Sequence, residues 1–108
     1  MDTLSGYAAA RPHVVPDSLD ELTGPTTGEV WLPTRLDWST ARSYRLDDRA
    51  DVQLLYERVI REALRRDDLR EFLNRDLLIS LWPTLFLPIR IRALWERRLP
   101  QLARTATV

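Results

Sequence analysis

Apolar residues recur at helical spacing through the second half of the chain, and the clearest run predicts its longest helix. The apolar positions of that run are Val52, Leu55, Tyr56, Val59, Ile60, Ala63 and Leu64. They follow an i, i+3, i+4, i+7 pattern, which places them on one face of an α-helix. We therefore expect a helix over residues 49–66, with Asp47 or Asp48 capping its first turn.

Shorter helices are expected after this one, over residues 69–73, 75–82 and 88–99. Asp67 and Asp68 stand where the first of them begins, and Asn74 stands before the second, so all three are predicted N-caps. Pro100 is expected to close the last helix. Residues 101–108 carry no clear pattern and are predicted to be frayed.

The first half of the chain has short β-branched and aromatic runs bounded by Gly and Pro. Residues 28–33 and 43–46 predict two strands of a loose hairpin spanning 28–46. Residues 1–24 are expected to form an irregular arm with one helical turn capped by Asp17. The predicted fold is α+β, with a small N-terminal β-hairpin and an irregular arm packed on a bundle of three to four short helices.

Length and composition bound what this fold can be. The chain has 108 residues, which suits a single domain with its helical part over 47–100. It has no Cys and one His, so disulfides, thiolate metal sites and multi-histidine zinc sites are excluded. The glycines form no phosphate-binding spacing. We expect no cofactor, no metal and no small-molecule substrate.

No combination of side chains in the sequence resembles a catalytic group. The paired carboxylates stand at predicted helix starts, where capping explains them. His13 lies between prolines without a nucleophile or acid at a known spacing, and is expected to be a solvated loop residue. The chain is therefore predicted not to be an enzyme. It also lacks an apolar run of membrane-spanning length and a secretory signal pattern, so the expected location is the cytoplasm, without membrane contact.

Charge is balanced overall but unevenly distributed. All sixteen basic residues are arginine, and the formal net charge is zero. Residues 1–56 carry nine acids and five arginines, whereas residues 57–108 carry seven acids and eleven arginines. Either the two halves fold together and neutralise each other, or the acidic half faces a basic partner. In the second case Asp17, Asp20 and Glu21 are candidate contacts.

Two further sets of residues are candidate contacts. Trp and Arg are enriched at the energetic centres of protein interfaces, and several occur in and near the hairpin. This candidate protein-binding patch consists of Trp31, Leu32, Arg35, Leu36, Asp37 and Trp38. The last predicted helix carries Arg90, Arg97 and Arg98, which are either a solvated face, a protein contact or a nucleic-acid surface. Trp82 and Trp95 are expected in the core.

Several short motifs resemble a group of small actinobacterial proteins encoded beside AbiEii-type nucleotidyltransferase toxins. The matching motifs are Gly24-Pro25, Leu32-Pro33, Leu36-Asp37-Trp38-Ser39, Leu46-Asp47-Asp48, Leu81-Trp82-Pro83, Leu87-Pro88 and Trp95-Glu96. The resemblance covers about residues 7–102. It departs at Leu99-Pro100, where the similar proteins usually have phenylalanine-proline.

The resemblance implies an antitoxin, a protein that binds the nucleotidyltransferase and keeps it from modifying its target. The alternative is a small DNA-binding regulator that uses the short helices after Asp67 as a helix-turn-helix-like pair. An antitoxin that represses its own operon would combine the two roles.

Overall fold

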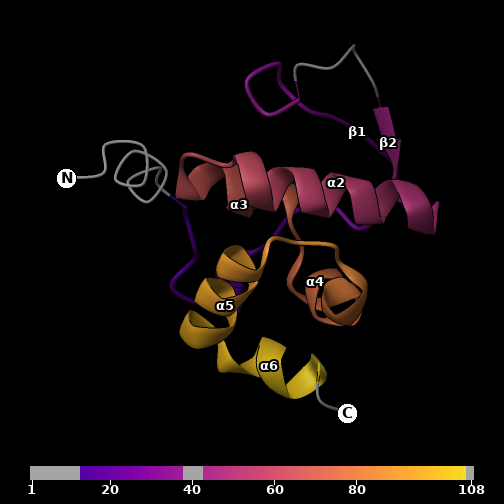
Figure 1. Ribbon diagram of the computed structural model, residues 1–108. Helices are drawn as coiled ribbons and strands as arrows, with labels where there is room; N and C mark the ends of the chain where they lie inside the picture. The colour runs from indigo at the N-terminus through magenta and orange to yellow at the C-terminus, as the bar shows by residue number, and fades with distance from the viewer. Residues whose placement is uncertain (1–12, 38–42, 107–108) are drawn as a thin grey trace.

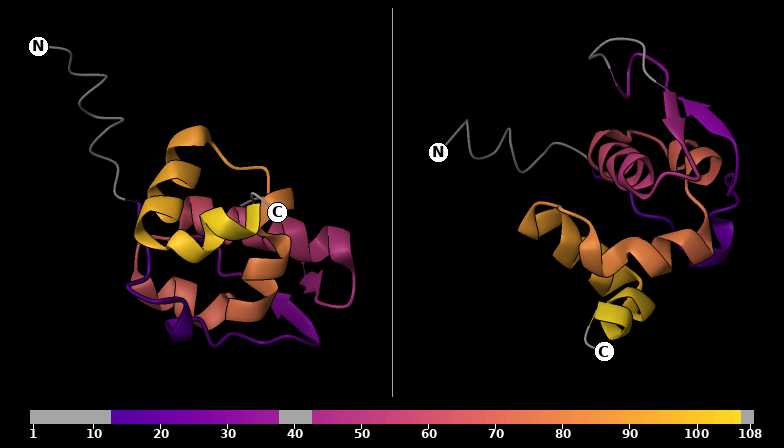
Figure 2. Two further views of the ribbon diagram at one scale, coloured as in Figure 1. Left: turned by 90° about the horizontal axis from the view of Figure 1, so that it is seen from below. Right: turned by 90° about the vertical axis from the view of Figure 1, so that its right-hand side faces the viewer.

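The computed structural model describes residues 13–37 and 43–106, which form the expected α+β fold. Helices α2 (Arg49–Glu62) and α3 (Arg66–Phe72) lie side by side at its centre. Strands β1 (Glu29–Trp31) and β2 (Ser43–Arg45) lie on one side of this pair (Figure 1). The other side is covered by α4 (Arg75–Leu81), the 3-10 turn η2 (Trp82–Thr84), α5 (Ile89–Arg98) and α6 (Pro100–Ala106). Figure 2 shows the same order from the side, with the hairpin and α6 at opposite ends.

The predicted hairpin is present. β1 and β2 pair antiparallel with Val30 opposite Tyr44, and these two side chains point into the core. The Leu46 N–H donates to the Gly28 carbonyl at 2.8 Å, which extends the pairing by one step. Gly28 has φ of 94°, a left-handed conformation that favours glycine. The hairpin is short, and packing of β2 on α2 supports it.

Helix α2 starts as predicted but ends earlier. Asp48 is its N-cap and accepts the Asp51 N–H at 3.2 Å. The helix stops at Glu62 instead of residue 66 because the next backbone amides have another acceptor. The Asp68 carboxylate accepts the N–H groups of Leu64 and Arg65, at 3.2 and 3.3 Å. This interaction turns the chain and starts α3.

The start of α3 corrects the predicted caps. The helix begins at Arg66, not residue 69, and its N-cap is Arg65. Asp68 therefore sits inside the first turn and reaches back to the cap, while Asp67 is exposed. Asn74 caps α4 as predicted, since its side chain accepts the N–H groups of Asp76 and Leu77.

The C-terminal segment forms a helix, which corrects the predicted frayed tail. Pro100 begins α6 instead of closing the chain's last helix, consistent with the preference of proline for a first turn. Leu99 and Leu102 are 2% and 0% exposed. Their burial against the other helices is the reason that this short segment is ordered, since propensity alone does not stabilise a helix of this length.

The described part of the predicted arm, residues 13–24, is packed on the helices. It forms the 3-10 turn η1 (Leu19–Glu21), whose N-cap is Ser18 and not Asp17. Leu19 and Leu22 are each 2% exposed. The irregular backbone over 13–18 and the single helical turn agree with the prediction, and the buried leucines hold this segment on the helices. Residues 1–12 lie outside the described ranges.

Two tryptophans form the centre of the lower helical layer, as predicted. Trp82 and Trp95 stack with ring centroids 6.0 Å apart, and both are 0% exposed. The Trp82 indole N–H donates to Glu96 at 2.9 Å. Burial of two such large rings provides much of the apolar surface that holds α4, η2 and α5 together.

Gly24 provides a direct test of how closely the N-terminal segment approaches α3. A Cβ at this position would lie 2.8 Å from the Leu73 carbonyl oxygen, so Gly24→Ala forces the backbones apart. We expect the free energy of unfolding to fall by about 1–3 kcal/mol. Urea denaturation measures it, with Thr27→Ala as the exposed control, which should stay within about 0.5 kcal/mol. An unchanged Gly24→Ala variant would contradict this close approach.

Candidate functional site

The structure does not expose the predicted hairpin patch as one surface. Trp31 is 60% exposed and Leu32 is half-buried, so these two remain accessible. Leu36 and Asp37 are buried, at 0% and 7% exposure. Asp37 accepts a hydrogen bond from the Tyr44 hydroxyl, which ties the segment after β1 to β2. Trp38 lies outside the described residues.

Arg35 is occupied by an internal ion pair. Its guanidinium donates to both carboxylate oxygens of Asp68, at 2.9 and 2.5 Å. The Asp68 side chain is 1% exposed, and Arg65 lies 3.7 Å away on its other side. The hydrogen bonds from Arg35 hold the pKa of Asp68 below its ordinary value, against the opposing effect of burial. Arg35 is thus a structural residue that fixes the hairpin to α3.

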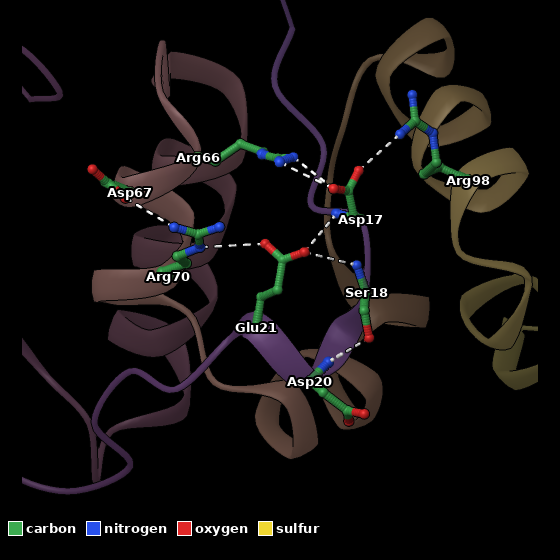
Figure 3. Close-up of polar contacts among 8 residues, drawn as sticks. All are labelled: Asp17, Ser18, Asp20, Glu21, Arg66, Asp67, Arg70 and Arg98. Atoms are coloured by element: carbon green, nitrogen blue, oxygen red, sulfur yellow. Dashed lines mark hydrogen bonds and ion pairs between the residues drawn. The ribbon is translucent and has the colours of Figure 1, made fainter.

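The acidic candidates Asp17, Asp20 and Glu21 are also paired within the chain, and Figure 3 shows the pairs of Asp17 and Glu21. Asp17 contacts Arg66 at 2.7 Å and Arg98 at 3.3 Å. The remaining pairs are Glu21 with Arg70 at 3.3 Å and Asp20 with Arg75 at 3.3 Å. These acids belong to the segment around η1, and their partners come from α3, α4 and α5.

The pairing bears on the hypothesis that these acids face a basic partner, which stays a prediction. Their charge is already compensated by arginines of the second half, which supports the alternative that the two halves neutralise each other. Glu21 has a second task, because its carboxylate accepts the N–H groups of Asp17 and Ser18 at 3.0 and 3.2 Å. It completes a capping box at η1.

The arginines of α5 divide into two groups. Arg98 is bound to Asp17, and Arg92 packs over the Trp82 ring, with 4.7 Å from its guanidinium carbon to the ring centroid. Arg90 and Arg97 are exposed and take part in no ion pair within the described ranges. Of the three arginines that the nucleic-acid alternative depends on, Arg90 and Arg97 are therefore unpaired within these ranges and Arg98 is not.

The segment between η2 and α5 is the most exposed apolar feature in the described part of the chain. Phe86 is 83% exposed and Ile89 is 84% exposed. We call residues 85–89, which end with the first residue of α5, the apolar loop. It crosses from α4 to α5 beside α2, as Figure 1 shows.

Hydrogen bonds to three side chains, two on α2 and one on α5, fix the apolar loop and the turn before it. The Phe86 N–H donates to the buried carboxylate of Glu57 at 2.6 Å. Gln53 of α2 donates to the Thr84 carbonyl at 3.1 Å. Arg92 of α5 donates to the Leu85 carbonyl and, at 3.2 Å, to the Trp82 carbonyl. The exposed Phe86 and Ile89 are thus presented by a backbone that is held in place.

Sequence reasoning missed the apolar loop as a site. Leu85, Phe86, Leu87 and Ile89 are all apolar, and a run of this kind between two helices is ordinarily assigned to the core. The signal that was present is the pair Pro83 and Pro88, which exclude regular helix across the run. Leu85 is only 4% exposed, whereas Phe86 beside it is 83% exposed. This difference comes from tertiary packing, which the sequence pattern does not encode.

Other features of the described residues give no chemical site. No group of three or more His, Cys, Asp or Glu side chains is arranged there to hold a metal ion. A hollow of about 590 Å³ is lined by Thr26, Thr27, Gly28, Glu29, Arg45 and Asp47. Arg45 and Asp47 pair with each other at 3.2 Å across an exposed surface. Separately, none of the helices in ranges 13–37 and 43–106 has the length and apolar character needed to cross a bilayer.

No protein-family model, curated protein or solved structure shows significant similarity to this chain. The apolar loop, with the surface around it, is therefore the candidate functional site on structural grounds alone.

The ion pair of Asp68 predicts a specific acid dependence of stability. Its native pKa lies below the ordinary value of 3.8, so the unfolded chain binds this proton first as the pH falls. The stabilisation is complete above about pH 5 and is lost as the pH drops through 3.8 toward the native pKa. Asp68→Asn should lower the free energy of unfolding at pH 7 by about 2 kcal/mol and flatten its fall between about pH 5 and pH 2.

Urea denaturation over this pH range measures both effects. Asp47→Asn is the matched control, because Asp47 pairs with Arg45 at the exposed surface, and it should change stability by less than about 1 kcal/mol. Equal acid dependence in wild type and Asp68→Asn would show that the Arg35 pair does not lower this pKa.

Proposed function

We propose that the chain is a non-catalytic protein-binding module whose contact surface is the apolar loop. One observation carries the proposal: Phe86 and Ile89 are more than four-fifths exposed, at 83% and 84%, on a backbone hydrogen-bonded to α2 and α5. Apolar side chains in this position gain free energy when a partner covers them, by about 25 cal/mol per Å² of buried apolar area. Exposed apolar surface beside polar residues is typical of protein interaction sites.

The fixed backbone adds to this argument. A partner that binds a mobile loop must first order it, at a cost of about 0.5–1.5 kcal/mol for each immobilised side chain with many rotamers. The apolar loop is already ordered by Glu57, Gln53 and Arg92, so less of the binding free energy is spent on ordering it. Phe86 then resembles the aromatic anchors that dominate protein interfaces.

The resemblance to small proteins encoded beside AbiEii-type nucleotidyltransferase toxins supplies the class of partner. The proposed role is that of a cytoplasmic antitoxin that binds such a toxin and blocks access to its target. In this role the chain covers a surface of the toxin and performs no reaction itself. The DNA-binding alternative has less support, since Arg98 is committed to Asp17.

The test is co-expression with the product of the downstream open reading frame, followed by size-exclusion chromatography and a growth assay. We expect a stable complex and growth that depends on this chain. The double variant Phe86→Ser/Ile89→Ser should lose the complex and the rescue. Because both side chains are exposed, its stability should stay within about 0.5 kcal/mol of wild type.

Trp31→Ser is the matched control, because Trp31 is also a large exposed side chain but lies on β1. It should keep the complex. Loss of the complex in Trp31→Ser with retention in the double variant would move the interface to the hairpin and contradict the proposal. Separate elution of the two wild-type proteins without rescue would remove the antitoxin role, and promoter-DNA binding would then be measured at several salt concentrations.

A further inference from the structure

Among the side chains that the structure describes, unpaired positive charge is concentrated on α2 and α5. The arginines of α3 and α4 are paired with acids, as shown above for Arg66, Arg70 and Arg75. Of the arginines whose side chains are described, those that take part in no ion pair are Arg49, Arg58, Arg61, Arg90 and Arg97. All of them lie on the two helices that hold the apolar loop.

On the α2 side, two of these arginines share a hollow with the residue that binds the Phe86 backbone. The carboxylate that accepts the Phe86 N–H belongs to Glu57, which also lines a hollow of about 80 Å³. Tyr44, Leu54, Arg58 and Arg61 form the rest of its wall. Leu54 is itself 44% exposed. Glu57 therefore connects the apolar loop to a hollow with an exposed leucine and two unpaired guanidinium groups.

On the α5 side, Ile89 is followed directly by Arg90. Arg97 lies two helical turns further along, on the same face as Arg90. The acid of this helix, Glu96, is turned away from that face, because it accepts the Trp82 indole N–H and pairs with Arg92 at 3.7 Å. The apolar loop thus has unpaired arginines on both of the helices that flank it.

We infer that this surface binds an acidic amphipathic segment of the partner protein. The cationic–apolar face is defined by Leu54, Arg58, Arg61, Phe86, Ile89 and Arg90. Apolar side chains of the segment cover the leucine, phenylalanine and isoleucine, and its carboxylates pair with the arginines. The inference rests on the proposed function, because it assigns the chemistry of the partner to the same surface.

Charge complementarity selects this occupant over the others. A second copy of the chain would bring two faces of like charge together, which costs free energy and suppresses self-association. A nucleic acid binds mainly through phosphate contacts and offers no cover for exposed Phe86 and Ile89. An acidic protein segment with an apolar stripe satisfies both kinds of side chain, as in helix-in-groove recognition.

The test uses a synthetic amphipathic helical peptide with a Leu/Phe stripe flanked by glutamates, and its Glu→Gln and Glu→Lys analogues. Binding to the full chain is measured by isothermal titration and by amide shifts in NMR spectra. We expect saturable binding of the acidic peptide with shifts at the apolar loop, and weaker binding of both analogues. Higher salt should weaken the binding, since the ion pairs are exposed.

The variant Arg58→Gln/Arg61→Gln should weaken binding of the acidic peptide by about tenfold, since an exposed ion pair contributes on the order of threefold. Arg49→Gln is the matched control, because Arg49 is also exposed and unpaired but starts α2, and it should leave binding unchanged.

The outcomes separate this inference from the proposed function. Binding lost in Phe86→Ser/Ile89→Ser but equal for the acidic, Gln and Lys peptides would overturn the inference and leave the apolar loop as a protein-binding surface. Binding that none of these variants changes would overturn both. Failure of the acidic peptide to bind, together with binding of duplex RNA or anionic vesicles at the same surface, would overturn the inference in favour of a different class of partner.

Discussion

The buried carboxylate of Asp68 connects more parts of this fold than any other polar group described here. It binds the Arg35 guanidinium through both oxygens and accepts two backbone N–H groups at the junction of α2 and α3. Through Arg35 it fixes the segment that follows β1, and through Leu64 and Arg65 it ends one helix and starts the next. A charge buried to this degree is tolerated because several partners satisfy it at once. The turn between the central helices α2 and α3 is thus held by the same carboxylate that fixes the segment after β1.

Internal pairing also decides which charges are left for a partner. The acids around η1 are compensated by arginines of α3, α4 and α5, so the opposite net charges of the two halves largely cancel across their contact. Among the described side chains, the guanidinium groups that remain unpaired lie on α2 and α5, the two helices that hold the apolar loop. A chain with zero formal net charge therefore presents a locally cationic surface next to its most exposed apolar side chains. Folding, and not composition, produces this distribution.

Local patterns predicted the elements well where one face of a helix is apolar or a capping residue is unambiguous, as at Asp48 and Asn74. They failed where a long-range contact decides the outcome. From the sequence, Asp68 is expected to be an N-cap. In the structure it lies inside the first turn of α3, where its carboxylate binds Arg35, 33 residues earlier in the chain. The same limit applies to the candidate site. Leu85 and Phe86 are apolar neighbours, and only tertiary packing determines that Leu85 is buried and Phe86 is exposed.

The ion pairs of Asp17 have a consequence for the order in which the molecule assembles during synthesis. Asp17 is bound to Arg66 and also to Arg98, which lies 81 positions later in the chain. The segment around η1 consequently completes its contacts only after α5 has left the ribosome. Until then the leucines of η1 have just part of their packing surface, because long-range contacts form late. A nascent chain of this protein is expected to remain open to proteases and chaperones through most of its translation.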